Sequence, residues 1–186
     1  MKVRKSNTAT EYHKAAEYIY SVFSAFLICM MIVFIAFTFF FRLVQVSGDS
    51  MYPTLENRDR LIISNLFYTP DYGDIIAISK NNGEEDAMIK RVIALPGDKV
   101  YIDFSTHIIT VNGNVLYEDY EVYEPISEQY DLTYPVTVPE NSVFVLGDNR
   151  NNSVDSRSAS VGFIDIEEIS GKALIRLFPI GKINIY

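Results

Sequence analysis

An uninterrupted stretch of apolar residues near the N-terminus is the clearest pattern in the chain. Residues 18–41 contain no charged side chain, and only Ser21, Ser24 and Thr38 interrupt their apolar surface. The stretch is about 24 residues long, and an α-helix needs roughly 20 residues to cross the hydrocarbon core of a bilayer. A core helix of a soluble domain would carry more polar residues on one face. We therefore predict a transmembrane helix at 18–41.

Beyond Arg42 the pattern changes to short, β-branched runs separated by turn residues, which is typical of β-strands. Asn112-Gly113, between two such runs, is the strongest hairpin signal in the chain. One helical turn fits at 165–169, and the segment 115–140, rich in Tyr, Glu and Pro, fits an inserted loop or small lobe. The expected strands are 60–63, 74–78, 99–102, 107–111, 114–116, 142–146 and 171–178. This pattern predicts a mainly β domain at 42–186, built of antiparallel β sheets or a partly closed barrel.

Basic residues are concentrated before the apolar stretch. They are Lys2, Arg4, Lys5 and Lys14. After the stretch, Arg42 is the only basic residue until Arg58. The positive-inside rule then makes residues 1–17 a cytoplasmic tail and places 42–186 on the outer side. The expected location is the cell membrane, which the chain crosses once, with the β domain extracellular.

A cleaved secretory signal is the alternative interpretation of the N-terminus, because Val46-Ser47-Gly48 offers small residues of the kind found at cleavage sites. The apolar core of such a signal is typically about 7 to 15 residues long, which is shorter than the stretch observed. Cleavage after Gly48 would also cut two residues before Ser50, the candidate nucleophile discussed below. A retained membrane anchor is therefore favoured.

The charge balance and the cysteine content exclude several classes of function. Sixteen Lys and Arg stand against 24 Asp and Glu, which gives a formal net charge of -8. Nucleic acid is not an expected partner, because its phosphates would be repelled. The single cysteine, Cys29, lies within the apolar stretch, so no intramolecular disulfide can form. No thiol is available after the stretch as a nucleophile or metal ligand.

Ser50 follows the apolar stretch closely and is a candidate nucleophile, but a serine hydroxyl needs a base within hydrogen-bond reach. The two histidines are poor candidates: His13 precedes the stretch, and His107 has only Asp103 as an acidic neighbour. A Ser-His-Asp triad is therefore not expected. Lys90 is the better candidate, because apolar residues flank it and burial can lower a lysine pKa by about 3 to 5 units. The ordinary alternative is a solvated lysine on an edge strand.

Three separated motifs, at 50–54, 90–98 and 147–157, resemble in order and character those of bacterial type I signal peptidases. Residues 72–76 are similar to the strand motif that lies between them in that family. The likeness runs from the anchor to near the C-terminus. It implies that Ser50 attacks the scissile carbonyl and that Lys90 serves as general base and then as general acid.

The same resemblance assigns supporting roles. It implies that Ser153 orients the lysine amine, which is chemically reasonable because a hydroxyl can hold a neutral amine without raising its pKa. Ion pairs that brace the site are implied for four further residues. These are Arg91, Asp148, Asp155 and Arg157.

Gly48 departs from part of the family, in which a serine at this position helps to bind the oxyanion. Members from Gram-positive bacteria often have glycine there, and the short stretch between Lys90 and Gly147 also resembles their compact form. The oxyanion hole would then rest on the Ser50 N–H and a second donor that the sequence does not identify. Relatives in the endoplasmic reticulum carry histidine where this chain has Lys90.

No metal or cofactor is expected. The acidic segment from Asp148 to Asp155 could indicate calcium or a plain surface turn. A calcium loop needs oxygen ligands at alternate positions and glycine at the sixth, whereas Arg150 and Ser153 occupy the third and sixth places from Asp148.

The expected function is that of a membrane-bound serine endopeptidase that removes signal peptides from secreted preproteins with a Ser/Lys dyad. From Arg42 to Ser50 the extended chain reaches at most roughly 26 to 29 Å, so Ser50 must work close to the lipid surface. The expected partners are the signal peptides of translocating preproteins and membrane lipid, and the oligomeric state stays open. The family resemblance implies small residues at the first and third positions before the cut, and the substrate is expected to add as a strand to a sheet edge.

Two other functions are compatible with parts of the pattern. A non-catalytic relative could act as an assembly chaperone for secreted or pilus-like proteins, but it would be expected to lack Ser50 or Lys90, and both are present. A self-cleaving Ser/Lys repressor would need a DNA-binding domain where this chain has an apolar stretch.

Overall fold

A computed structural model describes residues 3–79, 87–118, 120 and 122–180, with side chains from Tyr12 onward. The chain divides into two units, residues 1–40 and residues 41–186. The first unit contains one helix, and the second contains the β-strands. The two units are described separately below.

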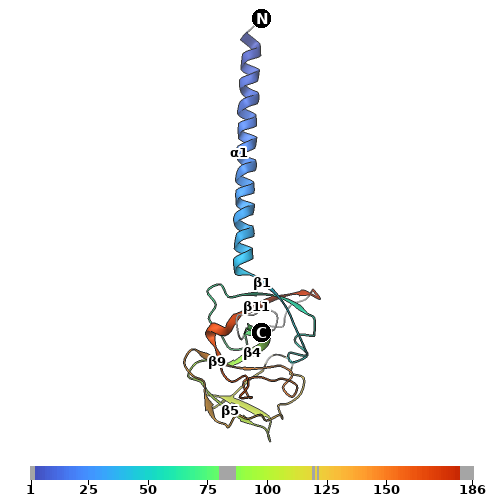
Figure 1. Cartoon of the computed structure of the whole chain (residues 1–186), viewed down its shortest axis with the longest axis vertical. Helices are drawn as coiled ribbons and strands as arrows, with labels where there is room; N and C mark the ends of the chain where they lie inside the picture. The colour runs from blue at the N-terminus through green and yellow to red at the C-terminus, as the bar shows by residue number, and fades with distance from the viewer. Residues whose placement is uncertain (1–2, 80–86, 119, 121, 181–186) are drawn as a thin grey trace. The chain divides into compact units, whose positions relative to one another are not determined.

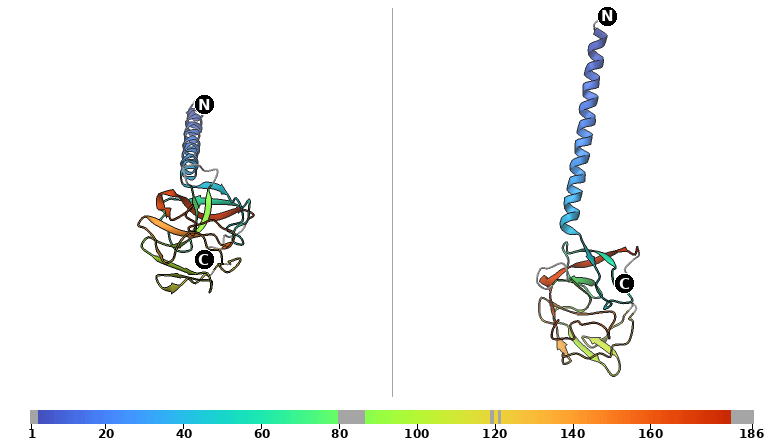
Figure 2. Two further views of the ribbon diagram at one scale, coloured as in Figure 1. Left: turned by 60° about the horizontal axis from the view of Figure 1, so that its bottom comes forward. Right: turned by 45° about the vertical axis from the view of Figure 1, so that its right-hand side comes forward.

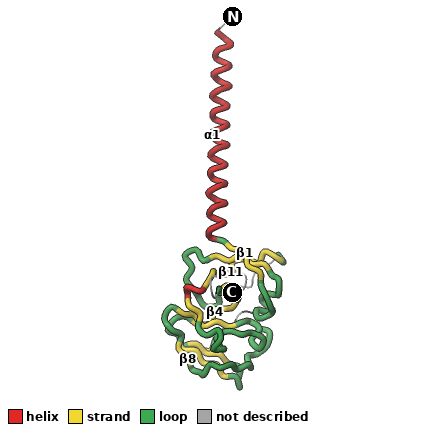
Figure 3. The backbone as a smooth tube through the Cα atoms, in the orientation of Figure 1, coloured by secondary structure: helices red, strands yellow, loops and turns green. Residues whose placement is uncertain are grey.

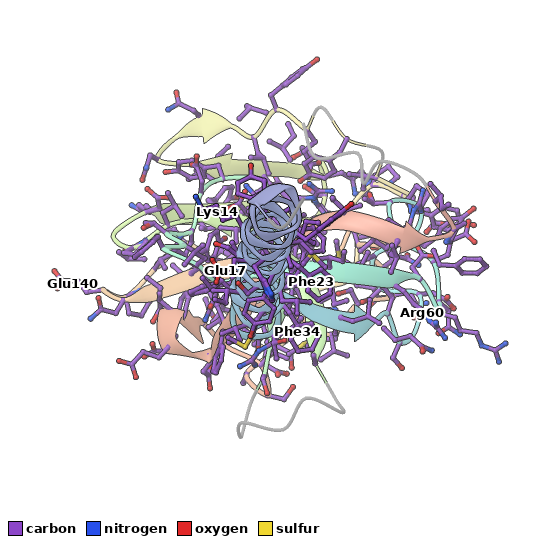
Figure 4. The ribbon with its side chains drawn as sticks, turned by 90° about the horizontal axis from the view of Figure 1, so that it is seen from above. Lys14, Glu17, Phe23, Phe34, Arg60 and Glu140 are labelled. Atoms are coloured by element: carbon purple, nitrogen blue, oxygen red, sulfur yellow. The ribbon has the colours of Figure 1, made fainter. Side chains whose placement is uncertain are left out.

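The first unit is the helix α1, Val3–Phe40 (Figure 1). Its part from Tyr12 to Phe40 is long and apolar enough to cross a membrane, and an 18-residue window within it has a mean hydropathy of 2.7. Large apolar side chains, among them Phe23 and Phe34, are exposed and are labelled in the view with side chains drawn (Figure 4). A helix that is apolar on all sides is typical of a membrane span. The predicted tail 1–17 is helical where it is described, whereas Lys2 and the side chains of Arg4 and Lys5 lie outside the described residues.

The second unit is mainly β and begins immediately after α1 (Figure 2). Within its described residues, one sheet has seven strands in the order β1-β2-β11-β3-β4-β9-β10, and each neighbouring pair is antiparallel. The strands are β1 Arg42–Gln45, β2 Arg60–Ser64, β3 Ile75–Ile78, β4 Met88–Ala94, β9 Ser142–Leu146, β10 Ile164–Asp165 and β11 Ile169–Phe178. β4 therefore lies inside the sheet, with partners on both sides.

A second, four-stranded antiparallel sheet has the order β7-β6-β5-β8. Its strands are β5 Lys99–Asp103, β6 Ile108–Val111, β7 Asn114–Val115 and β8 Val136–Thr137. The predicted hairpin is present, because Val111 pairs with Asn114 across the two-residue turn. Both turn residues have positive φ, 54° at Asn112 and 81° at Gly113, as this kind of turn requires.

The segment between β7 and β8, residues 116–135, is hereafter called the strap. Where it is described it has no regular secondary structure, and it is drawn as loop in Figure 3. A short 3-10 helix, η2 Ile166–Glu168, lies at the predicted helical turn. The Asp165 side chain caps it by accepting a hydrogen bond from the Glu167 N–H.

Alternation of apolar side chains gives the β unit its core. Strand β3 is buried on both faces, with Ile75 and Ala77 in one apolar cluster and Ile76 and Ile78 in another. A third cluster, which includes Phe144, joins β9 to the four-stranded sheet. The predicted fold class, mainly antiparallel β with one N-terminal apolar helix, is confirmed. Strands β1, β8 and β10 were not predicted.

Candidate active site

The candidate nucleophile lies in a turn that the core holds on both sides. Ser50 is partly buried, whereas Met51 and Leu55 are 1% and 0% exposed and belong to the apolar cluster of β2 and β3. The Leu55 N–H donates to the Met51 carbonyl over 2.9 Å, which closes the turn. Two buried apolar anchors therefore fix the backbone that carries the Ser50 hydroxyl.

Lys90 lies on β4, opposite Ile76 of β3 in the strand register. Its side chain is 3% exposed, and its Nζ is 2.7 Å from the Ser50 Oγ. Burial lowers the pKa of Lys90 from 10.5 to about 8, because an apolar surrounding disfavours the charged ammonium. The alternative of a solvated lysine on an edge strand is not what the structure shows.

Charged neighbours act on this lysine in opposite directions. After burial, the carboxylate of Asp155 raises the pKa of Lys90, the guanidinium of Arg157 lowers it, and Asp148 raises it. Burial is the largest of these effects, and it determines the direction of the shift. The amine can therefore lose its proton within the pH range in which proteins work.

Asp148, in the loop after β9, forms a bidentate ion pair with Arg91, and both side chains are 0% exposed. The Arg91 Nε donates to one carboxylate oxygen over 2.8 Å, and a second guanidinium nitrogen donates to the other over 2.7 Å. The remaining guanidinium nitrogen donates to the Gly73 carbonyl over 2.8 Å. The Thr54 hydroxyl donates to the same Asp148 carboxylate over 2.5 Å, which ties the nucleophile turn to the ion pair.

The next residue of that loop contacts the nucleophile backbone directly. The Asn149 N–H donates to the Ser50 carbonyl over 3.0 Å, and the Asn149 side-chain amide donates to the Asp49 carbonyl over 3.1 Å. The segment 147–157, hereafter the catalytic loop, therefore holds Ser50 from one side while Lys90 meets its hydroxyl from another.

Asp155 and Arg157 form the second buried ion pair, also with 0% exposure on both sides. The Arg157 Nε donates to Asp155 over 2.8 Å, and the Gly147 N–H donates to the same carboxylate over 3.1 Å. Arg157 also donates to the carbonyls of Arg150 and Ser153 over 2.5 Å and 3.2 Å. This pair fastens both ends of the catalytic loop together.

Gly147 and Ser153 come into close contact inside the loop. A Cβ on Gly147 would lie 2.3 Å from the Ser153 Oγ and 2.4 Å from the Ser50 carbonyl oxygen, so only glycine fits. Ser153 is 2% exposed, and its hydroxyl has no hydrogen-bond partner among the described residues. The hydrogen bond expected between this hydroxyl and the amine of Lys90 is therefore not formed in this structure.

Two further residues considered from the sequence, Gly48 and His107, lie within the described part of the chain. Gly48 is exposed with a φ of +83°, and a Cβ there would meet no atom within 4 Å. The Nδ1 of His107 lies 2.7 Å from the Ile126 carbonyl of the strap, an arrangement that does not involve Ser50. Among the described residues, no group of three or more His, Cys, Asp or Glu is arranged to hold a metal ion.

Three residues around the site were not predicted as functional. Thr54 and Asn149 lie inside the quoted motifs, but their contacts with Asp148 and with Ser50 depend on the fold. Arg150 is 1% exposed, and its Nε donates to the Gly147 carbonyl over 2.9 Å. Nothing in the sequence distinguishes an arginine that is buried in a polar loop from one that is exposed to solvent.

Comparisons with known proteins point to one family. The family model of signal peptidase, peptidase S26, matches residues 19–178. Signal peptidase I P of Bacillus subtilis subsp. natto is 37% identical over 171 residues, which cover 86% of this chain and 89% of the relative. Probable signal peptidase I-2 of Synechocystis sp. is 38% identical over 156 residues, which cover 80% of this chain and 68% of the relative. A crystal structure of a signal peptidase I from Enterococcus faecalis V583 aligns with 32% identity and a TM-score of 0.43, over 56% of this chain and 97% of that one.

The chain therefore belongs to the peptidase S26 family of signal peptidases. Within that family it is a type I signal peptidase, a serine peptidase of the hydrolase class that removes signal peptides. The resemblance drawn from the sequence motifs is confirmed, and Bacillus proteins are among the relatives. The N-terminal apolar helix is consistent with a membrane-anchored enzyme.

Proposed function

We propose that this enzyme cleaves signal peptides from translocating preproteins with Ser50 as nucleophile and Lys90 as general base. The observation that carries the proposal is the 2.7 Å contact between the Ser50 Oγ and the Nζ of a lysine that is 3% exposed. This distance suits an amine N–H that donates to the hydroxyl and equally a hydroxyl that donates to an unprotonated amine. The second state is the reactive one.

In the first half-reaction the Ser50 hydroxyl passes its proton to the neutral Lys90 amine while Oγ attacks the scissile carbonyl. The resulting ammonium then protonates the leaving nitrogen, the C–N bond breaks, and an ester to Ser50 remains. In the second half-reaction Lys90 accepts a proton from water as the water attacks the ester. The proton returns to Oγ, which releases the signal peptide acid and restores the enzyme.

The negative oxygen of each tetrahedral intermediate needs hydrogen-bond donors. The Ser50 N–H is the first, because it makes no hydrogen bond within the described part of the chain. Gly48 leaves open space beside the nucleophile turn but supplies no side-chain donor. The two buried ion pairs support the reaction by holding the catalytic loop in position against Ser50. They join Arg91 with Asp148 and Arg157 with Asp155. Ser153 is proposed to orient the Lys90 amine when the substrate fills the site.

The membrane arrangement is part of the proposal. The predicted single crossing lies within α1, with the N-terminus in the cytoplasm and residues 42–186 outside. The membrane anchor and the short connection to Ser50 suit a substrate that is itself held in the bilayer by an apolar helix. Small residues before the cut and strand addition of the substrate remain expectations from the family resemblance.

The test compares the full-length chain in lipid or detergent with its Ser50→Ala and Lys90→Ala variants, on a preprotein with an intact signal peptide. Both variants are expected to lose cleavage. Ser47→Ala and Lys99→Ala are matched controls at exposed positions and are expected to retain it. Normal turnover by Lys90→Ala would refute the assignment of the base.

A pH profile tests the protonation state independently. With the pKa of Lys90 at about 8, the unprotonated fraction falls about tenfold for each pH unit below that value and saturates above it. The kcat/KM should therefore rise from acidic to alkaline pH and level off above about pH 8 to 9. A flat profile from pH 6 to 9 would mean that no titrating lysine limits the rate.

A further inference from the structure

The strap places an aromatic ring against the buried arginine of each ion pair. The Arg91 guanidinium carbon lies 3.7 Å from the centre of the Tyr120 ring, and that of Arg157 lies 5.1 Å from the centre of the Tyr130 ring. Both arginines are 0% exposed. The sequence predicts an inserted loop or small lobe at 115–140, and the strap lies within that segment. In the structure, two tyrosine rings of the strap cover the arginines that hold the catalytic loop.

Tyr120 is fixed by hydrogen bonds of its own. Its hydroxyl donates to Glu118 over 2.8 Å and accepts from Arg150 over 2.9 Å, and Arg150 also forms an ion pair with Glu118. Because the Arg150 Nε donates to the Gly147 carbonyl, this cluster joins the strap to the start of the catalytic loop. The ring of Tyr120 is therefore held in place over Arg91.

The far half of the strap is attached to the same loop. The Asn151 side chain accepts from the Ser127 and Glu128 N–H groups over 2.9 Å and 3.1 Å and donates to the Pro125 carbonyl over 3.0 Å. Arg157 donates to the Glu128 carbonyl over 3.0 Å. The strap therefore contacts the catalytic loop at two places, at residues 118 and 120 and at residues 125–128.

We propose that Tyr120 and Tyr130 are positioning residues of the peptidase reaction: by covering Arg91 and Arg157 they keep the catalytic loop, and through it Ser50, in reactive geometry. The path from Tyr120 runs through Arg91 and Asp148 to the Thr54 hydroxyl and, through the neighbouring Asn149 N–H, to the Ser50 carbonyl. A ring over a guanidinium excludes water from the ion pair and attracts the cation by its π-face. Without it, water competes for Arg91 and the loop gains freedom.

The proposal rests on the Ser50 and Lys90 mechanism proposed above, and it predicts an effect on kcat more than on KM. Tyr120→Leu and Tyr130→Leu, which keep apolar bulk but remove the ring, should each lower kcat by roughly tenfold, because a shift of 1 Å in a catalytic group can cost up to about 10²-fold. Tyr130→Phe keeps the ring and should stay within roughly threefold of the wild type. Tyr120→Phe also keeps the ring but loses the hydroxyl contacts with Glu118 and Arg150, so its kcat should lie between those of the wild type and Tyr120→Leu. Tyr117→Leu, in the same strap but at a tyrosine that is 87% exposed, is the matched control and should not change kcat.

The full-length chain is assayed below the unfolding temperature of every variant, so that a loss of folded protein is not mistaken for a loss of rate. Unchanged kcat in both Leu variants would overturn the proposal even if their unfolding temperatures fall. An equal loss in Tyr130→Phe and Tyr130→Leu would also overturn it, because the ring would then not be the part that matters.

A measurement that does not depend on catalysis distinguishes the positioning role of Tyr120 from the proposed Ser50 and Lys90 mechanism. Hydrogen–deuterium exchange of peptides that cover 147–152 reports the Asn149 N–H that contacts Ser50. Exchange in this segment should be fastest in Tyr120→Leu, closer to that of the wild type in Tyr120→Phe, and unchanged in Tyr117→Leu. If Lys90→Ala cleaves normally while this exchange pattern holds, the mechanism fails and the positioning role stands. If exchange is the same in all variants, the positioning role fails.

Discussion

Replacing Lys90 by Met is expected to make the folded protein more stable at neutral pH while it abolishes catalysis. The side chain is 3% exposed, and burial lowers its pKa from 10.5 to about 8. At 1.36 kcal/mol per pH unit, this difference means that the charged amine lowers the unfolding free energy by about 3 kcal/mol. Met keeps the apolar length of the side chain without the charge. The lost contact with the Ser50 hydroxyl offsets about 1 kcal/mol, so a net gain of about 2 kcal/mol is expected at pH 7.

The sign of the pH dependence follows from the two pKa values. Below about pH 8 the amine is protonated in both the folded and the unfolded chain, and the folded state bears the full cost. Between about pH 8 and 10.5 the folded chain has released this proton and the unfolded chain still binds it, so the stability contributed by this group rises with pH. The advantage of Lys90→Met should therefore shrink as the pH rises and, toward pH 11, give way to a deficit of about 1 kcal/mol, because only the lost contact with the Ser50 hydroxyl remains.

The assay is urea unfolding of the full-length protein in detergent at pH 7, 9 and 11, followed by tyrosine near-UV circular dichroism. Lys99→Met is the control, because Lys99 is an exposed lysine on β5. Only Lys90→Met should exceed the wild type in stability at pH 7 and lose that advantage by pH 11. A Lys90→Met protein that is less stable than the wild type at pH 7, with a difference independent of pH, would refute the reasoning that the charge is held at a cost.

Substitutions at three further positions test the surroundings of the site. Asp148→Asn leaves the fully buried Arg91 without its counter-charge. The unfolding free energy measured by denaturant titration should therefore fall by about 3 to 5 kcal/mol. A decrease of less than about 1 kcal/mol would show that Arg91 does not depend on this carboxylate. Gly147→Ala forces a methyl group to 2.4 Å from the Ser50 carbonyl oxygen. The rate constant kcat should therefore fall by roughly 10²-fold in single-turnover assays. An unchanged kcat would show that the catalytic loop can move aside at no cost. Gly48→Ser and Gly48→Ala carry the same backbone strain at a φ of +83°, so their ratio of kcat isolates the added hydroxyl. A ratio of roughly 10 or more in favour of serine is expected if that hydroxyl reaches the oxyanion, and a ratio of 1 would exclude it.

The strands that the sequence predicts correctly are those in which the apolar pattern extends over at least four residues, such as β2, β5 and β9. β1 was missed because Arg42–Gln45 continues directly from the apolar stretch, and only its pairing with β2 identifies it as a strand. β8 and β10 contain two residues each, which is too short for any period to show. Their existence depends on neighbours that are distant in the sequence.

The candidate site also has a part that the sequence predicts and a part that depends on the fold. Ser50 and Lys90 stand out in the sequence because of their residue types, their order and their position after the anchor. The contact of Thr54 with Asp148 joins residues 94 positions apart, and that of Asn149 with Asp49 joins residues 100 positions apart. No local pattern encodes such pairs, so they emerge only when β4, β9 and the nucleophile turn are folded together. The covering of Arg91 by Tyr120 is of the same kind.

The pairing of each loop carboxylate with an arginine explains how a buried charged loop and a weakly basic lysine can coexist. An unpaired Asp148 or Asp155 near Lys90 would raise its pKa and keep the amine protonated at neutral pH, because an opposite charge favours the ammonium. Arg157 acts in the opposite direction on the same amine, and Arg91 neutralises Asp148 through two hydrogen bonds. The loop thereby gains the rigidity of buried, directional ion pairs without a net charge beside the base. Because buried pairs seldom add stability over apolar packing, we infer that they are retained here for geometry, and the strap that covers their arginines serves the same end.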